Sequence, residues 1–222
     1  MQSKIGVLIR CYSITDYLPA ILKNYTWVDK IVVLNYRFKS ATPREDDTEK
    51  IVRAFSHKNL VFEKGEGISQ HDIFNRGMKM IEDCTTAFIS DADEFIALPS
   101  MRDIVYHMES GDYGMGSCRI IDYAFDYYHR FDNRHLNPTL VVVKPKAVEF
   151  VKIRIAHTKL KHKIFDHKLY HFGFVLPKKT LDWKLRWESK EERLDITKGI
   201  TQTRIVLADP PEAEILKLLE NL

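Results

Sequence analysis

Apolar and polar positions alternate in blocks along the first hundred residues. Four short apolar runs have the length of strands, and they lie at 4–10, 29–35, 60–63 and 87–90. The run at 29–35 is almost unbroken, as in a parallel strand buried on both faces. The stretches between them have helical periodicity, at 14–24, 46–56 and 69–82. This alternation predicts an α/β fold with a parallel, Rossmann-like sheet.

Local signals predict the boundaries of some elements. Asp16 is expected to cap the first helix, with Pro19 in its first turn. Residues 36–44 and the glycine-containing residues 64–67 are expected to form loops. In the second half we expect helices at 101–108, 178–193 and 211–222, strands at 113–121 and 169–174, and antiparallel strands at 139–143 and 148–155.

Composition is that of an ordinary globular domain. The chain has 222 residues, of which 45% are hydrophobic and 29% charged, which is enough for one domain with a full core. No apolar run approaches the roughly 20 residues that span a bilayer, and the N-terminal residues lack a signal-peptide pattern. Cys11, Cys84 and Cys118 are scattered without metal-ligand spacing, so we expect buried thiols and a cytoplasmic protein.

Charge is unevenly distributed, although the net charge is only +3. Residues 144–193 contain 14 Lys and Arg against 6 Asp and Glu, a local excess of +8. Such a segment could attract a nucleotide-sugar, an anionic glycan, a membrane surface or a nucleic acid, or it could be a solvated face.

An acidic run follows the fourth apolar segment. Residues 87–90 lead into Asp91, Ala92, Asp93 and Glu94. Side chains alternate along extended backbone, so Asp91 and Asp93 would point the same way and could hold Mg²⁺ or Mn²⁺ together with phosphate oxygens. The alternative is that these acids only close a strand at a solvated turn.

Five segments, taken together and in order, carry a family resemblance. They are 7–19, 31–52, Asn75-Arg76-Gly77, Asp91-Ala92-Asp93-Glu94-Phe95, and His171-Phe172-Gly173-Phe174 with Pro177 and Lys184. This pattern resembles the GT-A fold glycosyltransferases, specifically the family-2-like group, whose Asp-Xaa-Asp motif can continue as Glu-Phe. It departs from the family at Asn35, where an acid usually meets the base, at Phe74, where an arginine is common, and in its longer loop at 36–44.

The resemblance implies a fold and a reaction. The fold would be a single GT-A domain over residues 1–222 with a mostly parallel central sheet, helices on both faces and a smaller antiparallel and helical C-terminal portion. Residues 1–97 would be the nucleotide-binding half and 98–222 the acceptor-side half. The reaction would be metal-dependent transfer of a sugar from a nucleoside diphosphate sugar, with UDP-sugar expected, to a hydroxyl of a glycan or other acceptor.

Candidate site residues come from the resemblance and from the strand ends. The metal ligands for Mn²⁺ or Mg²⁺ would be Asp91, Asp93 and His171. The residues that bind the donor would be Arg10, Tyr12, Asn35, Asn75, Asp91, Lys178 and Lys184. The catalytic acids, including a base for the acceptor proton if the reaction inverts, would be Asp93, Glu94, Asp122 and Asp126.

Three other classes of function compete with this interpretation. A phosphatase of the haloacid-dehalogenase type would continue its Asp-Xaa-Asp with Gly-Thr near the N-terminus, and a sugar-1-phosphate nucleotidyltransferase would have a glycine-rich loop after the first strand; neither pattern is present. A non-enzymatic module that binds an anionic glycan or nucleic acid through residues 144–193 stays open, although nucleic acid is not the expected partner. Its binding would depend steeply on salt and not on metal.

Overall fold

The computed structural model describes residues 3–12, 15–37, 46–66, 69–124, 126–131, 138–152, 154–178, 180–181, 205–207 and 211–220. Lys184 and most of the helix predicted at 178–193 lie outside these residues, as does most of the loop predicted at 36–44.

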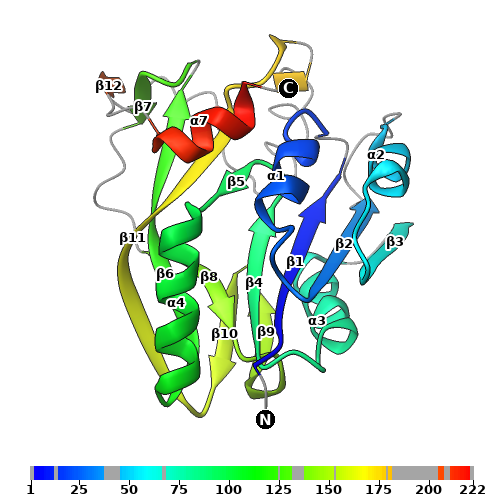
Figure 1. The fold of residues 1–222 in the computed structure, drawn as a ribbon, viewed down its shortest axis with the longest axis vertical. Helices are drawn as coiled ribbons and strands as arrows, with labels where there is room; N and C mark the ends of the chain where they lie inside the picture. The colour runs from blue at the N-terminus through cyan, green and yellow to red at the C-terminus, as the bar shows by residue number, and fades with distance from the viewer. Residues whose placement is uncertain are drawn as a thin grey trace.

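The first half of the chain forms the parallel part of a large sheet (Figure 1). Its strands run in the order β3-β2-β1-β4, all parallel. They are β1 (Ile5–Cys11), β2 (Lys30–Arg37), β3 (Leu60–Glu66) and β4 (Thr86–Asp91), joined through α1 (Leu18–Asn24), α2 (Thr48–Ala54) and α3 (Gln70–Met80). The predicted parallel α/β arrangement is therefore confirmed.

The second half extends the same sheet with mixed strand directions. Beyond β4, the strands β8 and β6 pair antiparallel, and β11 then runs parallel to β6. The short β5 pairs antiparallel with β11, and β7 pairs with β6 and β12. These elements are β5 (Glu94–Phe95), α4 (Leu98–Ser110), β6 (Tyr113–Ala124), β7 (His129–Phe131), β8 (Thr139–Val143), β11 (Lys161–Phe174), β12 (Ile205–Leu207) and α7 (Ala213–Leu219).

Two apolar layers cover the sheet. Along β1, Val7 and Ile9 belong to one core, which also contains the apolar sides of α1, α4 and α7, whereas Leu8 belongs to a second core against α3. Helices α1, α4 and α7 lie on one face of the sheet and α3 lies on the other (Figure 1). The approach of α3 is close at Gly77, where an added Cβ would lie 2.4 Å from Cδ2 of Leu8. Helices on both faces explain why the central strands are apolar throughout.

A small two-stranded sheet lies beside α3. It consists of β9 (Val148–Lys152) and β10 (Ile155–Thr158), which follow the 3₁₀ turn η1 (Pro145–Ala147). Residues 139–143 and 148–152 are antiparallel strands, as predicted, but residues 148–155 do not form one strand. The largely apolar β8 lies between β4 and β6, while the half-exposed β9 pairs with β10.

Some predicted boundaries also change. Asp16 does not cap α1, because the helix begins at Leu18 and Tyr17 occupies the N-cap position without a side-chain cap, although Pro19 does lie in the first turn. The expected loops at residues 36–37 and 64–66 are strand, because β2 and β3 stay paired as far as Arg37 and Glu66.

Three features bear on the predicted environment. Cys11, Cys84 and Cys118 are free and buried, as predicted. Within the described ranges, no helix has the length and apolar character that crossing a membrane requires. Before its pairing with β5 at Tyr170, β11 has β6 as its one strand partner in the described part of the sheet. Lys161, Lys163 and Lys168 lie in this part of β11.

Candidate functional site

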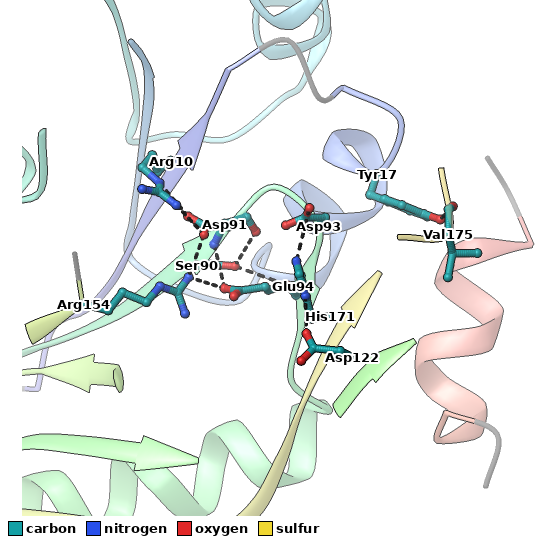
Figure 2. A network of polar contacts seen from close by, with 10 residues as sticks. All are labelled: Arg10, Tyr17, Ser90, Asp91, Asp93, Glu94, Asp122, Arg154, His171 and Val175. Atoms are coloured by element: carbon teal, nitrogen blue, oxygen red, sulfur yellow. Dashed lines mark hydrogen bonds and ion pairs between the residues drawn. The ribbon is translucent and has the colours of Figure 1, made fainter. Parts of the chain in front are cut away.

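The acidic run lies at the carboxyl edge of the sheet, where β4 turns into β5 (Figure 2). Backbone contacts fix the turn to β11: the Phe172 N–H donates to the Asp93 carbonyl at 2.9 Å, and Glu94 is in register with His171. The hydroxyl of Ser90 also donates to the Glu94 carbonyl at 3.2 Å. The turn therefore presents its carboxylates from a rigid frame.

Asp91 is held by two arginines. Arg10 is its register partner on β1 and donates from Nε to Oδ1 at 2.8 Å and from Nη2 to Oδ2 at 2.6 Å. Arg154 approaches the same Oδ2 at 3.3 Å. Burial alone would raise the pKa of Asp91, but the charges of Arg10 and Arg154 hold that pKa below its usual value, so the carboxylate is ionised.

Glu94 is a buried acid, with its side chain 4% exposed. Its Oε2 accepts the backbone N–H of Asp91 at 2.9 Å and pairs with Arg154. Burial raises the pKa of Glu94, and the Arg154 charge opposes this rise. For Arg154 itself, burial acts to lower the pKa, but Glu94 and Asp91 raise it above its usual value, so the guanidinium stays charged.

His171 lies between two carboxylates (Figure 2). Its Nδ1 is 2.5 Å from Oδ1 of Asp122, and its Nε2 is 3.5 Å from Oδ2 of Asp93. Burial lowers the pKa of His171, but Asp93 and Asp122 outweigh it and raise that pKa to about 10. The side chain is therefore an imidazolium at neutral pH, and it would have to release a proton to bind a metal ion.

Two side chains of the site have atoms that suit a metal ion. The described residues hold no cluster of three or more His, Cys, Asp or Glu side chains in metal-binding geometry, and Asp91 faces Arg10 and Arg154. Asp93 and His171 do face each other, and a carboxylate with an imidazole suits Mn²⁺ whose other ligands are phosphate oxygens and water.

The remaining candidates lie in other contacts. Asn35 is buried at the end of β2, where its Nδ2 donates to Asp46 at 3.1 Å and its Oδ1 has no partner among the described residues. Tyr12 follows β1 and is half-buried, and Lys178 is exposed. Their roles in donor binding stay predictions.

Two candidates have clear structural roles. Both amide atoms of Asn75 bond the backbone of Phe150, with Nδ2 donating to its carbonyl at 2.8 Å and Oδ1 accepting its N–H at 2.9 Å, so Asn75 fastens β9 to α3. Asp126 accepts the backbone N–H groups of Tyr128 at 2.8 Å and His129 at 2.9 Å, and so caps the turn before β7.

Two residues of this network were not singled out from the sequence. Arg154 was counted only as part of the basic segment, since nothing local indicates that the β9–β10 turn aims it at Asp91 and Glu94. Tyr17 donates its hydroxyl to the Val175 carbonyl and thereby ties the start of α1 to the segment after β11 (Figure 2). The family-like position of Tyr17 before Leu18 and Pro19 was the one available signal.

Comparison with solved structures shows the class of fold. A proposed nucleotide-diphospho-sugar transferase from Desulfovibrio desulfuricans G20 matches with a TM-score of 0.50 at 10% identity, over 98% of this chain and 99% of that one. TarS from S. aureus also matches with a TM-score of 0.50, at 14% identity over 90% of this chain and 45% of that one. A 4-diphosphocytidyl-2C-methyl-D-erythritol synthase matches at 13% identity over 83% of this chain and 98% of that one, with a TM-score of 0.48.

The likenesses to TarS and to the Desulfovibrio protein show the fold alone, an α/β, GT-A-like fold with a mostly parallel mixed sheet. The chain spans less than half the length of TarS and of two matching mycobacterial chains. No protein-family model matches the sequence, and no curated protein matches it significantly.

Proposed function

We propose that this chain is a glycosyltransferase that moves a sugar from a nucleoside diphosphate sugar to an acceptor hydroxyl, the acceptor being a glycan. The observation that carries the proposal is the acidic turn at the carboxyl end of β4, with Asp93 facing His171, in a GT-A-like sheet. Ligands of open α/β sheets bind at that edge.

The donor would lie across the ends of β1, β2 and β4. The buried acceptor atom of Asn35 supports a contact with an N–H of the base, and UDP is the expected nucleotide. Arg10, Lys178 and Lys184 add positive charge for the diphosphate. Arg10 already donates to both oxygens of the Asp91 carboxylate. It would therefore contact the diphosphate while it stays bound to Asp91.

Asp93 and His171 would hold the divalent cation, with Mn²⁺ preferred because imidazole suits it. When bound there, the cation would neutralise the charge that develops on the departing diphosphate. Asp122 orients the His171 ring through Nδ1, so that Nε2 points at the Asp93 carboxylate.

If the reaction inverts the anomeric configuration of the sugar, a carboxylate must remove the acceptor proton. Of the candidates in the network, Asp122 has its side chain 15% exposed and Glu94 only 4%. Glu94 is also fixed by Arg154 and by the backbone of Asp91. Asp122 is therefore our first choice of base, ahead of Glu94 and of Asp126, which caps a turn.

A thermal-shift panel tests the proposal. UDP, GDP, CDP and ADP are each added with Mn²⁺, Mg²⁺ or chelator to the native protein, to Asp93→Ala and to a control, Asp166→Ala, which removes an exposed carboxylate on β11. A ligand that binds only the folded state raises Tm. We expect one nucleotide to raise Tm in the presence of metal, in the native protein and the control but not in Asp93→Ala.

Two outcomes would contradict it. A metal-dependent shift that persists in Asp93→Ala removes Asp93 from the metal site. The lack of a shift with every nucleotide rejects the donor site and favours the module that binds anions through residues 144–193.

A further inference from the structure

Arg154 occupies an unusual position in the backbone. It lies between β9 and β10 with φ at 49°, and it is the one non-glycine residue in the described ranges with a positive φ. Left-handed backbone at a side chain of this size costs free energy and persists where the surroundings enforce it, often at functional sites. Here the enforcing contacts are with the acidic turn and, through Asn75 and Phe150, with α3.

Of the two terminal nitrogens of the Arg154 guanidinium, one has carboxylate partners. Its Nη2 pairs with Glu94 and lies 3.3 Å from Asp91, and the side chain is 10% exposed. Its Nη1 is buried and has no hydrogen-bond partner within the structure as described. Buried N–H donors without acceptors are rare and costly in native proteins, so this nitrogen has unused capacity to bind a ligand atom.

The charges around Arg154 indicate which kind of atom that is. Arg154 faces the carboxylates of Glu94 and Asp91, and Arg10 shares Asp91, so the two arginines and two acids compensate one another and a further anion such as a phosphate gains little at Nη1. A neutral hydroxyl fits better, because it can accept from Nη1 and donate to a neighbouring carboxylate oxygen. A ligand rich in hydroxyl groups is a sugar.

We propose that Arg154, together with Glu94, binds a hydroxyl of the donor sugar. This deepens the proposed function and rests on it. Asp93, on the diphosphate side of that site, precedes Glu94 in the same turn, and His171 on β11 is in register with Glu94; a donor places its sugar directly next to its diphosphate. Arg154 is thus a specificity-determining residue that distinguishes the sugar-bearing donor from the bare nucleotide.

The test is calorimetric titration, in the presence of Mn²⁺, of UDP and of its sugar esters UDP-glucose, UDP-galactose and UDP-N-acetylglucosamine. If the thermal-shift panel selects another nucleotide, that nucleotide and its sugar esters are used instead. The proteins are the native chain, Arg154→Lys, and Arg53→Lys, which alters an exposed arginine paired with Glu49 on α2. We expect Arg154→Lys to bind the preferred ester about tenfold more weakly while UDP affinity changes less than about twofold, since a charged hydrogen bond is lost only from the sugar. Arg53→Lys should change neither affinity.

A second arm uses analogues of the ester, and its first part keeps the proposal falsifiable even if Arg154→Lys does not fold. Monodeoxy analogues of the preferred ester are titrated into the native protein, where removal of one particular hydroxyl should cost about tenfold. That same removal should cost nothing further in Arg154→Lys.

The outcomes separate the two proposals. An equal loss for UDP and its ester, an unchanged ester affinity, or deoxy analogues that all bind as well as the parent would each overturn the role of Arg154 while leaving the nucleotide site intact. If the native protein binds neither UDP nor any ester, the proposed function itself fails.

Discussion

The two ends of the sheet use charged residues in opposite ways. At the carboxyl edge, the side chains of Asp93 and Glu94 are 6% and 4% exposed, and each depends on a nearby cation. At the amino edge, Asp83 binds Lys4 and Lys30 in ion pairs that are largely open to water, with the carboxylate 47% exposed. Both edges pair carboxylates with cations, but the exposure of the carboxylates differs.

The comparison indicates which of the two clusters of charged residues costs more folding free energy, and is therefore expected to have a function. Solvated ion pairs contribute little and cost little, typically about 0–1 kcal/mol each. Buried ones lose several kcal/mol in desolvation and repay it only when every partner is present. A dense, buried, mutually dependent set of charges in an edge that binds ligands is therefore the stronger functional candidate.

The largest predicted effect tests the buried edge. Arg154→Met should lower the free energy of unfolding by about 3 kcal/mol, because it leaves Glu94 and Asp91 buried with less compensating charge. Urea denaturation measures this change, with Arg53→Met as the surface control. Adding Glu94→Gln to Arg154→Met should recover part of the loss. If Arg154→Met costs less than about 1 kcal/mol, the buried pair is not energetically coupled and the contrast between the edges fails.

A smaller effect is expected where the β9–β10 sheet is fastened. Asn75→Ala should cost about 1–3 kcal/mol, because it leaves the backbone N–H and carbonyl of Phe150 without their partners. Asn59→Ala is the matched control, since that exposed amide donates to the Asp29 carbonyl and should matter by less than about 0.5 kcal/mol. Equal small effects in thermal denaturation would show that Asn75 does not hold Arg154 in place.

The smallest effect concerns the amino edge and depends on pH. Hydrogen bonds from Lys4 and Lys30 lower the pKa of Asp83 to about 2. Because the folded pKa is depressed, the stabilisation is present above the unfolded pKa of about 4 and is lost as pH falls towards 2. Asp83→Asn should therefore be slightly less stable than the native protein at pH 6, by at most about 1 kcal/mol, and equal to it near pH 2. A difference that stays constant across this range in urea denaturation would contradict the assignment.

The sequence predicts the parallel half of the fold well because its signals are local. β1, β2 and β4 are short apolar runs, β3 begins with one, and each intervening helix has its own periodicity. The second half depends on pairings between distant segments. Neither the insertion of β8 beside β4 nor the parallel pairing of β11 with β6 leaves a local trace.

In the candidate site too, some residues can be located from local signals, whereas their contacts depend on distant segments. Asp91, Asp93 and Glu94 follow an apolar strand and can be located from that pattern alone, and the resemblance adds His171. What the sequence does not give is the partner of each acid. Asp91 and Asp93 were expected to act together, yet one faces Arg10 and Arg154 and the other faces His171, because partners from β1, β9–β10 and β11 approach the turn from different sides.

The lysines along β11 have a consequence for the chain in concentrated solution. An unpaired strand edge can recruit the same edge of a second molecule and begin a continuous, aggregated sheet. Two such copies would bring Lys161, Lys163 and Lys168 of one molecule against the same row of the other, and the ammonium group of Lys163 is itself held 5.3 Å above the ring of Tyr113. Repulsion between these lysines would oppose such pairing, so within the described part of the sheet the strand that carries His171 near one end carries charges at the other that disfavour aggregation.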